Sequence, residues 1–255
     1  KDGTYVNTER RVQLARKAIP APGAARGDLE ILLELSNRIG LPTPFRTAAD
    51  VMEEIASVTP SWRGITHARL QETGGLQYPV DHATHPGTAF LFADRFPTAD
   101  GKATLVPVEF LPPAELPDEE FPFWMNTGRQ LYHWHTGTMT RRSQGLDSRE
   151  PVPTVELSPA DAAEMGVRDG DAVRITSLRN SIEIAVRLSP RVARHQVFVP
   201  MHYREAAANL LTNPALDPYA HIPEFKVCAV RIEPVAPGTH RALSIERIEP
   251  LVPAD

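Results

Sequence analysis

The spacing of apolar and polar residues changes along this chain near residue 115. Before that point, the clearest pattern is 27–40, where apolar side chains recur at helical spacing. Asp28 is the expected N-cap and Gly40 the expected stop, so we predict a helix over this range. A shorter helix is predicted over 48–56. The Gly, Pro, Thr and His content of 57–102 predicts long ordered loops, which are rarely stable alone.

A proline-rich acidic stretch, 111–122, predicts a linker. Between the strands that follow it lies one helix, in which Ser158 is the N-cap, Pro159 the first residue, Asp161 a first-turn acid and Gly166 the end. Short apolar stretches predict the strands 121–126, 154–157, 172–177, 181–188, 196–199 and 226–232. This periodicity indicates a small mixed barrel.

Composition narrows the class of protein. The 255 residues are enough for two domains with buried cores. The net charge of -5 argues against a nucleic-acid-binding surface.

Cys228, the only cysteine, can form neither an internal disulfide nor an iron–sulfur site, and its apolar neighbours predict a buried core residue. No signal peptide or membrane-spanning apolar run is visible, which favours a cytoplasmic protein.

A first polar cluster begins where the strand 121–126 is expected to open into a loop. Gly128 would let a backbone approach a ligand closely. Arg129 carries a planar fork suited to phosphate or a pterin ring. Hydroxyl and imidazole groups follow as far as residue 142 and supply neutral hydrogen bonds. The alternative is an ordinary turn with satisfied histidines.

A second cluster of the same kind follows the predicted strand 196–199. It comprises 201–204, 206–213, 217–218 and 223–226. One such cluster stands at the end of each half of the predicted barrel domain. Together their polar groups suggest a large, polar, phosphorylated ligand.

A metal site is a further hypothesis for the first cluster. Because alternate residues of an extended segment face the same side, His133 and His135 could ligate zinc together. No cysteine or carboxylate with suitable spacing joins them, so we expect no metal ligand in this chain. Arg141 and Arg142 could contact phosphate or a neighbouring domain, or form a solvated basic turn.

Taken in order, these motifs resemble a known domain. The residues 127–129, 134–140, 209–212, 217–218 and 223–226 are similar to the C-terminal molybdopterin-dinucleotide-binding domain of the bis-molybdopterin guanine dinucleotide oxidoreductases. Within that superfamily, the sequence most resembles the catalytic alpha subunit of formate dehydrogenase, particularly the soluble NAD-linked kind. The segments 3–13, 74–79 and 86–88 look like the preceding part of the same subunit.

The resemblance implies an architecture. Residues 1–114 would be an α/β segment from the end of the catalytic domain, and 115–235 a mixed β-barrel, a double-psi barrel with capping helices. Residues 236–255 would form a tail. The start at Lys1 without an initiator Met leads us to expect the C-terminal piece of a longer polypeptide. Relatives carry the iron–sulfur cysteines, the metal ligand and the formate-reactive His and Arg upstream, so we expect no catalytic residue here.

The resemblance also implies the cofactor and its contacts. The cofactor would be bis-molybdopterin guanine dinucleotide with molybdenum or tungsten, and Arg129 and Lys226 would be the cationic candidates. Carried over by position, the expected cofactor-binding residues, some acting through backbone atoms, are Thr127, Gly128, Arg129, His133, His135, Thr136, Thr138, Met201, His202, Asn209, Phe225 and Lys226.

The implied function belongs to an intact subunit. It would oxidise formate to carbon dioxide, or run the reverse reaction, with electrons leaving through iron–sulfur clusters to NAD or another acceptor. The expected partners are the upstream domains and iron–sulfur/flavin diaphorase-type subunits, and the fragment alone should be inactive. One alternative is nitrate reductase or another member of the superfamily. A second, from a different class, is a free-standing, non-catalytic cofactor-binding or interaction module.

Overall fold

The computed structural model describes residues 1–235, and the chain separates into two compact units between Pro107 and Val108. The predicted domain boundary at 114/115 lies a little further along the chain and stays a prediction. The predicted tail, 236–255, falls outside the described residues.

The first unit combines a small antiparallel sheet with three short α-helices. Its sheet has the order β1-β2-β3. Its core comprises Val12, Met52, Ile65, Leu70, Leu76 and Val80. The elements are β1 (Gly3–Val6), β2 (Arg11–Ala15), α1 (Asp28–Arg38), α2 (Ala48–Val58), a 3₁₀ turn η1 (Pro60–Trp62), α3 (His67–Thr73) and β3 (Leu76–Gln77).

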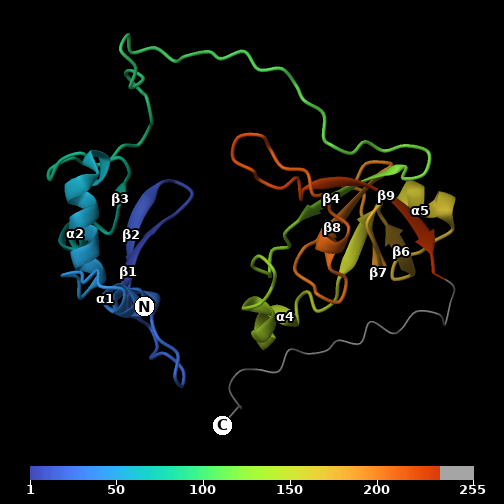
Figure 1. Ribbon diagram of the computed structural model, residues 1–255, viewed down its shortest axis with the longest axis horizontal. Helices are drawn as coiled ribbons and strands as arrows, with labels where there is room; N and C mark the ends of the chain where they lie inside the picture. Colours follow the sequence, from blue (N-terminus) through green and yellow to red (C-terminus); the bar gives the residue numbers. More distant parts are fainter. Residues whose placement is uncertain (236–255) are drawn as a thin grey trace. The chain divides into compact units, whose positions relative to one another are not determined.

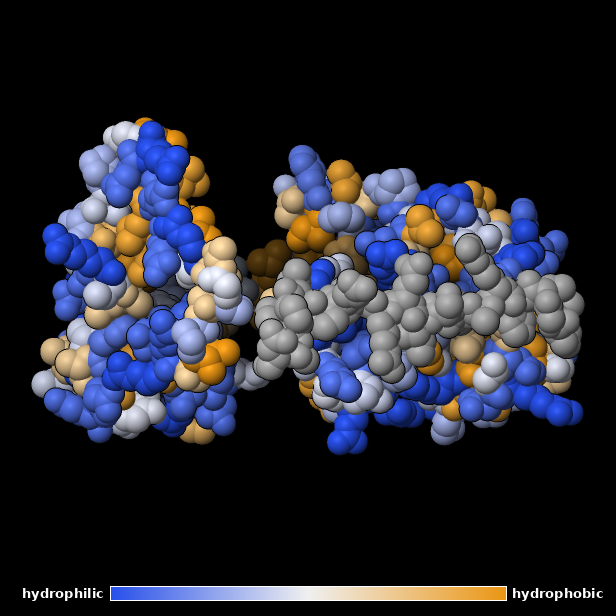
Figure 2. Space-filling view, turned by 90° about the horizontal axis from the view of Figure 1, so that it is seen from below, coloured by the Kyte–Doolittle hydropathy of each residue, from blue (hydrophilic) through white to orange (hydrophobic). Residues whose placement is uncertain are grey.

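Helix α1 confirms the helix predicted over 27–40, but its cap differs from the prediction. Gly27 is the N-cap and makes no side-chain cap, whereas Asp28 is the first helical residue. There the acidic side chain still favours the positive end of the helix dipole. No residue of α1 is buried within the unit, and Leu32 and Leu35 are more than half exposed. Hydrophobic residues also reach the surface of both units on the face drawn in Figure 2.

The remainder of the first unit is more regular than predicted. Helix α2 is confirmed and begins with a capping box formed by Thr47 and Asp50. Helix α3 lies inside the segment 57–102 that was predicted to be loops, so that prediction is wrong there. Thr66 caps α3 by accepting a hydrogen bond from the Arg69 amide, and Gly74 ends it with a φ of +71°.

Two arginines hold the irregular segment that follows β3. Arg10 donates hydrogen bonds to the backbone carbonyls of Tyr78, Thr88 and Ala89. Arg69 donates to the His85 carbonyl at 2.8 Å. Because these carbonyls have no partners in a sheet or helix, the guanidinium groups satisfy them and order the loop.

The second unit is a closed barrel of six strands in the order β4-β8-β5-β7-β6-β9 (Figure 1). The pairs β4·β8 and β5·β7 are parallel, and the other pairs are antiparallel. All six predicted strands are confirmed with small shifts of their ends. They are β4 (Phe123–Gly128), β5 (Thr154–Leu157), β6 (Ala172–Thr176), β7 (Ser181–Leu188), β8 (Gln196–Pro200) and β9 (Val227–Pro234). The predicted fold class, an α/β segment followed by a double-psi-type mixed barrel, is confirmed.

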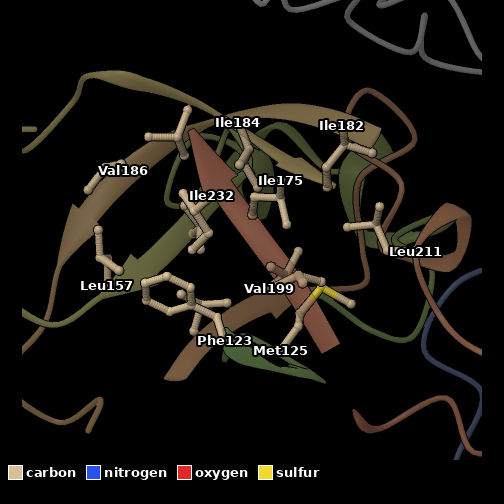
Figure 3. Close-up of a cluster of buried hydrophobic side chains, with 14 of the residues drawn as sticks. Phe123, Met125, Leu157, Ile175, Ile182, Ile184, Val186, Val199, Leu211 and Ile232 are labelled. Atoms are coloured by element: carbon tan, nitrogen blue, oxygen red, sulfur yellow. The ribbon is translucent and has the colours of Figure 1, made fainter. Parts of the chain in front are cut away.

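Alternating side chains of the barrel strands fill its interior (Figure 3). Phe123 and Met125 of β4 meet Ile184 of β7, Val199 of β8 and Ile232 of β9 there. Burying each such side chain contributes about 1.5–3 kcal/mol. The sulfur of Cys228 lies in this core, as predicted.

Short helices accompany the barrel, as the resemblance implied. Helix α5 (Pro159–Met165) starts where Ser158 accepts a hydrogen bond from the Asp161 amide, and it ends at Gly166 with a φ of +69°. Both predicted caps are therefore confirmed. The chain leaving β4 contains a 3₁₀ turn, η2 (Thr140–Arg142), and helix α4 (Gln144–Asp147), and the chain leaving β8 contains η3 (Ala208–Leu210). Within residues 1–235, no helix is long and apolar enough to cross a membrane.

Candidate cofactor-binding site

The candidate site lies where the parallel strands β4 and β8 end side by side. Gly128 pairs with Pro200 at the last position of this ladder. The Met201 amide continues it by donating to the Gly128 carbonyl at 3.0 Å. Because neighbouring parallel strands end at the same edge, the loops that leave them start together. The two polar clusters of the sequence are thereby brought into one place.

His202 connects the two loops. It is 1% exposed, and its Nε2 accepts a hydrogen bond from the Gln130 amide at 2.7 Å. Its Nδ1 donates to the carbonyl of His135. This pattern requires the neutral imidazole, in which one nitrogen donates and the other accepts. Burial, the largest influence, lowers the pKa of His202 and favours the same form.

His133 supports the loop after β4 from inside. It is buried, its Nε2 donates to the Glu150 carbonyl at 2.8 Å, and its Nδ1 lies 3.2 Å from the Thr140 hydroxyl. His135 is exposed, with Nε2 3.3 Å from Nη2 of Arg129. Both ring nitrogens of His133 are engaged inside the protein, whereas the ring of His135 lies at the surface beside Arg129. The two rings are therefore not arranged to bind one zinc ion, and the zinc hypothesis is not supported. Residues 1–235 also contain no group of three or more His, Cys, Asp or Glu residues arranged to hold a metal.

A cavity of about 240 Å³ opens between the two loops. Five of the predicted cofactor-binding residues line it, namely Thr136, Thr138, Met201, His202 and Asn209. The other lining residues are Arg141, Tyr203, Arg204, Ala207 and Ala208. Hydroxyl and amide groups are donors that phosphate and polar ring systems can use. The donor set fits part of a dinucleotide, such as a phosphate group or a base.

Thr127, Phe225 and Lys226 form a separate contact beside the first loop. Thr127 is buried, its hydroxyl donates to the Phe225 carbonyl at 2.6 Å, and its amide donates to the Lys226 carbonyl at 3.0 Å. Lys226 is exposed, with Nζ 5.2 Å from the centre of the Phe225 ring. Thr127 therefore fixes the backbone of this segment and leaves the ammonium group of Lys226 accessible.

The structure shows a packing constraint at Gly128 that the sequence did not suggest. A Cβ at this position would lie 2.5 Å from Cε2 of Phe198, on the neighbouring strand β8. Glycine at this position therefore leaves room for an aromatic ring that packs against the β4 backbone. A close approach of ligand, the predicted reason, stays a prediction.

Arg129 lies at a second cavity, of about 510 Å³, and does not line the first. Gln130 and Arg191 also line this second cavity, as do Glu150 and Arg187, which form an ion pair with 2.9 Å between Oε2 and Nη2. The twelve predicted residues are thus distributed over one edge of the barrel, with five of them at a single cavity.

Sequence reasoning missed several groups that build the site. The Tyr203 hydroxyl lies 2.9 Å from Oε1 of Gln130, and burial raises the pKa of Tyr203. Arg141 is buried and pairs with Glu205, 64 residues away, so the hypothesis of a solvated basic turn is wrong for Arg141. No local pattern marks such long-range partners.

Comparison with known proteins identifies families that match both parts of the chain. Residues 123–229 match the family described as molydopterin dinucleotide binding domain, and residues 1–38 match the family described as molybdopterin oxidoreductase. One of these matched regions lies in each of the two units.

Curated relatives match across both units. The F420-dependent formate dehydrogenase subunit alpha of Methanocaldococcus jannaschii is 44% identical over 235 residues, which are 91% of this chain and 35% of that protein. The assimilatory nitrate reductase catalytic subunit of Bacillus subtilis is 37% identical over 243 residues, covering 92% and 34% of the two chains. The chain thus spans about a third of the length of these relatives.

A solved structure shares the fold. Acetylene hydratase from Pelobacter acetylenicus superposes with a TM-score of 0.65 at 15% identity, over 92% of this chain and 37% of that one. At this level of identity the similarity shows the fold alone.

Proposed function

We propose that this chain, which belongs to the molybdopterin oxidoreductase family, is the cofactor-holding C-terminal portion of a formate dehydrogenase catalytic subunit. The complete protein would oxidise formate to carbon dioxide or run the reverse reaction. The relatives named as formate dehydrogenase alpha subunits, at 44% and 40% identity, support this choice of substrate.

The observation that carries the proposal is the cavity of about 240 Å³ between the loops that follow β4 and β8, because five of the predicted residues line it. Its hydroxyl groups, on Thr136 and Thr138, would donate to phosphate oxygens of molybdopterin guanine dinucleotide. The amide of Asn209 both donates and accepts, so it would suit the edge of a guanine ring. Arg129 and Lys226 would supply positive charge nearby.

When bound, this cofactor supplies the metal centre at which molybdenum or tungsten exchanges electrons with the substrate. The residues of this chain bind and orient the dinucleotide, and none is proposed to attack formate. His133 and His202 would hold the loops rather than donate to the ligand, because their ring nitrogens are engaged within the protein. Iron–sulfur clusters and the metal ligand would lie elsewhere in the longer protein.

The electron acceptor and partners are part of the same proposal. NAD was expected from the resemblance, and relatives named as F420-dependent make F420 a second candidate acceptor. The partners would be the upstream domains and iron–sulfur/flavin diaphorase-type subunits, in the cytoplasm.

Nitrate reduction is the second candidate function. The nitrate reductase relative is 37% identical to this chain, the same identity as the F420-dependent formate dehydrogenase 2 subunit alpha of Methanococcus maripaludis. Assays of the native protein with formate plus an oxidised dye, and with nitrate plus a reduced dye, distinguish the two activities. Turnover with formate alone supports our proposal, and turnover with nitrate alone contradicts it.

Variants test the binding role directly. Arg129→Ala and Lys226→Ala should lower the amount of cofactor per protein while leaving the turnover of each loaded molecule nearly unchanged. Arg174→Ala is the matched control, because Arg174 is exposed on β6 and pairs with Glu183 outside the cavity. A variant that keeps full cofactor but loses turnover would contradict the binding role. Native protein without metal or guanine nucleotide would favour the free-standing module.

A further inference from the structure

The guanidinium group of Arg141 is buried between the two loops of the site. The residue is 6% exposed, and its Nη1 lies 2.8 and 2.7 Å from the two carboxylate oxygens of Glu205. Its Nε donates to Oδ1 of Asp147 at 3.3 Å. Its Cζ lies 5.0 Å from the centre of the Tyr203 ring. Arg141 therefore contacts one carboxylate on each of the two loops, and it also packs against the Tyr203 ring.

These contacts join the two loops that line the 240 Å³ cavity. Arg141 follows Thr136 and Thr138 on the loop after β4, and Glu205 precedes Ala207, Ala208 and Asn209 on the loop after β8. The ion pair between Arg141 and Glu205 consequently ties the loop that carries the two hydroxyl groups to the loop that carries Asn209.

The charges around Arg141 indicate that it joins the two loops and does not bind an anionic ligand. One guanidinium faces two carboxylates, so the cluster formed by Arg141, Asp147 and Glu205 carries no excess positive charge toward a phosphate. Burial opposes the charged form, yet the Glu205 and Asp147 carboxylates outweigh it and raise the pKa of Arg141. The group is permanently charged and its partners are within the protein.

Gly137 makes room for this arrangement. Its φ is +75°, and a Cβ there would lie 2.8 Å from the His202 carbonyl oxygen and 2.9 Å from Cγ of Arg141. The Arg141 amide also donates to the Gly137 carbonyl at 2.9 Å. The backbone of the first loop is therefore folded closely around the arginine side chain.

We propose that Arg141 is a positioning residue whose ion pair with Glu205 holds the two loops at the separation that retains the dinucleotide. The inference rests on the proposed function and assigns a retention role to a pair whose charges are engaged with each other. Opening the pair should increase the rate of cofactor loss more than it lowers the turnover of molecules that remain loaded.

The test compares variants of the native protein. Arg141→Met removes the positive charge of the pair, and Glu205→Gln removes its negative charge with a smaller change of shape. Arg194→Met is the matched control, because Arg194 pairs with the buried carboxylate of Asp161 away from the cavity. For each protein we would measure thermal unfolding, retained guanine nucleotide, its rate of release after dilution, and turnover per bound cofactor.

We expect Arg141→Met and Glu205→Gln to release nucleotide about ten times faster than the unmodified protein, an effect of the size seen when supporting groups behind a ligand are lost. The Arg194→Met control should keep its nucleotide even if its unfolding temperature falls equally. If Arg141→Met does not fold, the milder Glu205→Gln variant decides.

Two results would overturn the inference. Equal release rates for Glu205→Gln and the control would show that the pair only stabilises the fold, while leaving the proposed function intact. Native protein without any guanine nucleotide would instead refute the proposed function, and the retention role with it.

Discussion

The buried imidazole of His202, just after β8, accepts a hydrogen bond from the backbone amide of Gln130, just after β4, at 2.7 Å. The same ring donates from Nδ1 to the His135 carbonyl. One side chain therefore satisfies two backbone groups of the neighbouring loop. An imidazolium could not accept the first of these bonds, so the arrangement requires a neutral ring.

Stability should consequently depend on pH through His202. Its pKa is lowered from 6.5 in the folded state, mainly by burial, so the unfolded state takes up the proton first as pH falls. The stabilising contribution of His202 should be complete above pH 6.5 and be lost progressively below it. Urea unfolding of the native protein and of His202→Gln from about pH 8 to about pH 5 measures this. A difference in unfolding free energy that does not change over this range would contradict the neutral ring.

Gly128→Ala should destabilise the barrel by about 1–3 kcal/mol, because the new Cβ overlaps a packed ring. The added carbon would lie 2.5 Å from Cε2 of Phe198. Gly145→Ala is the matched control, since Gly145 is in α4 and a Cβ there meets no atom within 4 Å. Thermal unfolding of both variants should show a loss only at Gly128. Equal unfolding temperatures would mean that Phe198 has room to move.

Asp161→Ala should cost about 3 kcal/mol, because one buried carboxylate accepts several hydrogen bonds. Asp161 accepts from the Ser158 hydroxyl at 2.7 Å, from the His195 amide at 2.9 Å and from Nε of Arg194 at 3.2 Å. These contacts outweigh the effect of burial and lower the pKa of Asp161. Glu164→Ala, on the exposed side of α5, should cost less than about 0.5 kcal/mol. Similar losses for the two variants in urea unfolding would contradict the proposed importance of Asp161.

Cys228 should not react with thiol reagents while the protein is folded. It is buried in the barrel core, and burial raises the pKa of its thiol to about 11. Both effects suppress the thiolate, which is the reactive form. Labelling with a thiol-reactive dye at about pH 8 should therefore occur only after denaturant is added. Rapid labelling of this residue in the folded protein would show that the barrel opens readily.

The barrel was predictable because its signals are local. Each strand is a short apolar stretch between turn residues, and α5 carries a serine cap, a first-position proline and a terminal glycine. Helix α3 was missed because seven residues are too few to show a helical period, although Thr66 and Gly74 mark its ends. At α1, Asp28 was a plausible cap by residue type, yet Gly27 takes the extended backbone conformation of an N-cap.

The site was only partly predictable because its supporting contacts cross the barrel. The parallel pairing of β4 with β8 places Gln130 next to His202, and Arg141 next to Glu205. A sequence shows that these residues are polar but not that they are buried and paired. Exposed groups such as Asn209 and Lys226 were easier to select by type, and their contact with a cofactor remains a proposal.

Cofactor analysis of the native protein tests the central claim most directly. The protein would be denatured, its released guanine nucleotide quantified, and its molybdenum and tungsten measured on the same sample. We predict guanine nucleotide together with one of these metals, in amounts that fall in Arg129→Ala and Lys226→Ala. Native protein that turns over formate but releases no guanine nucleotide would contradict the claim that this chain holds a molybdopterin guanine dinucleotide.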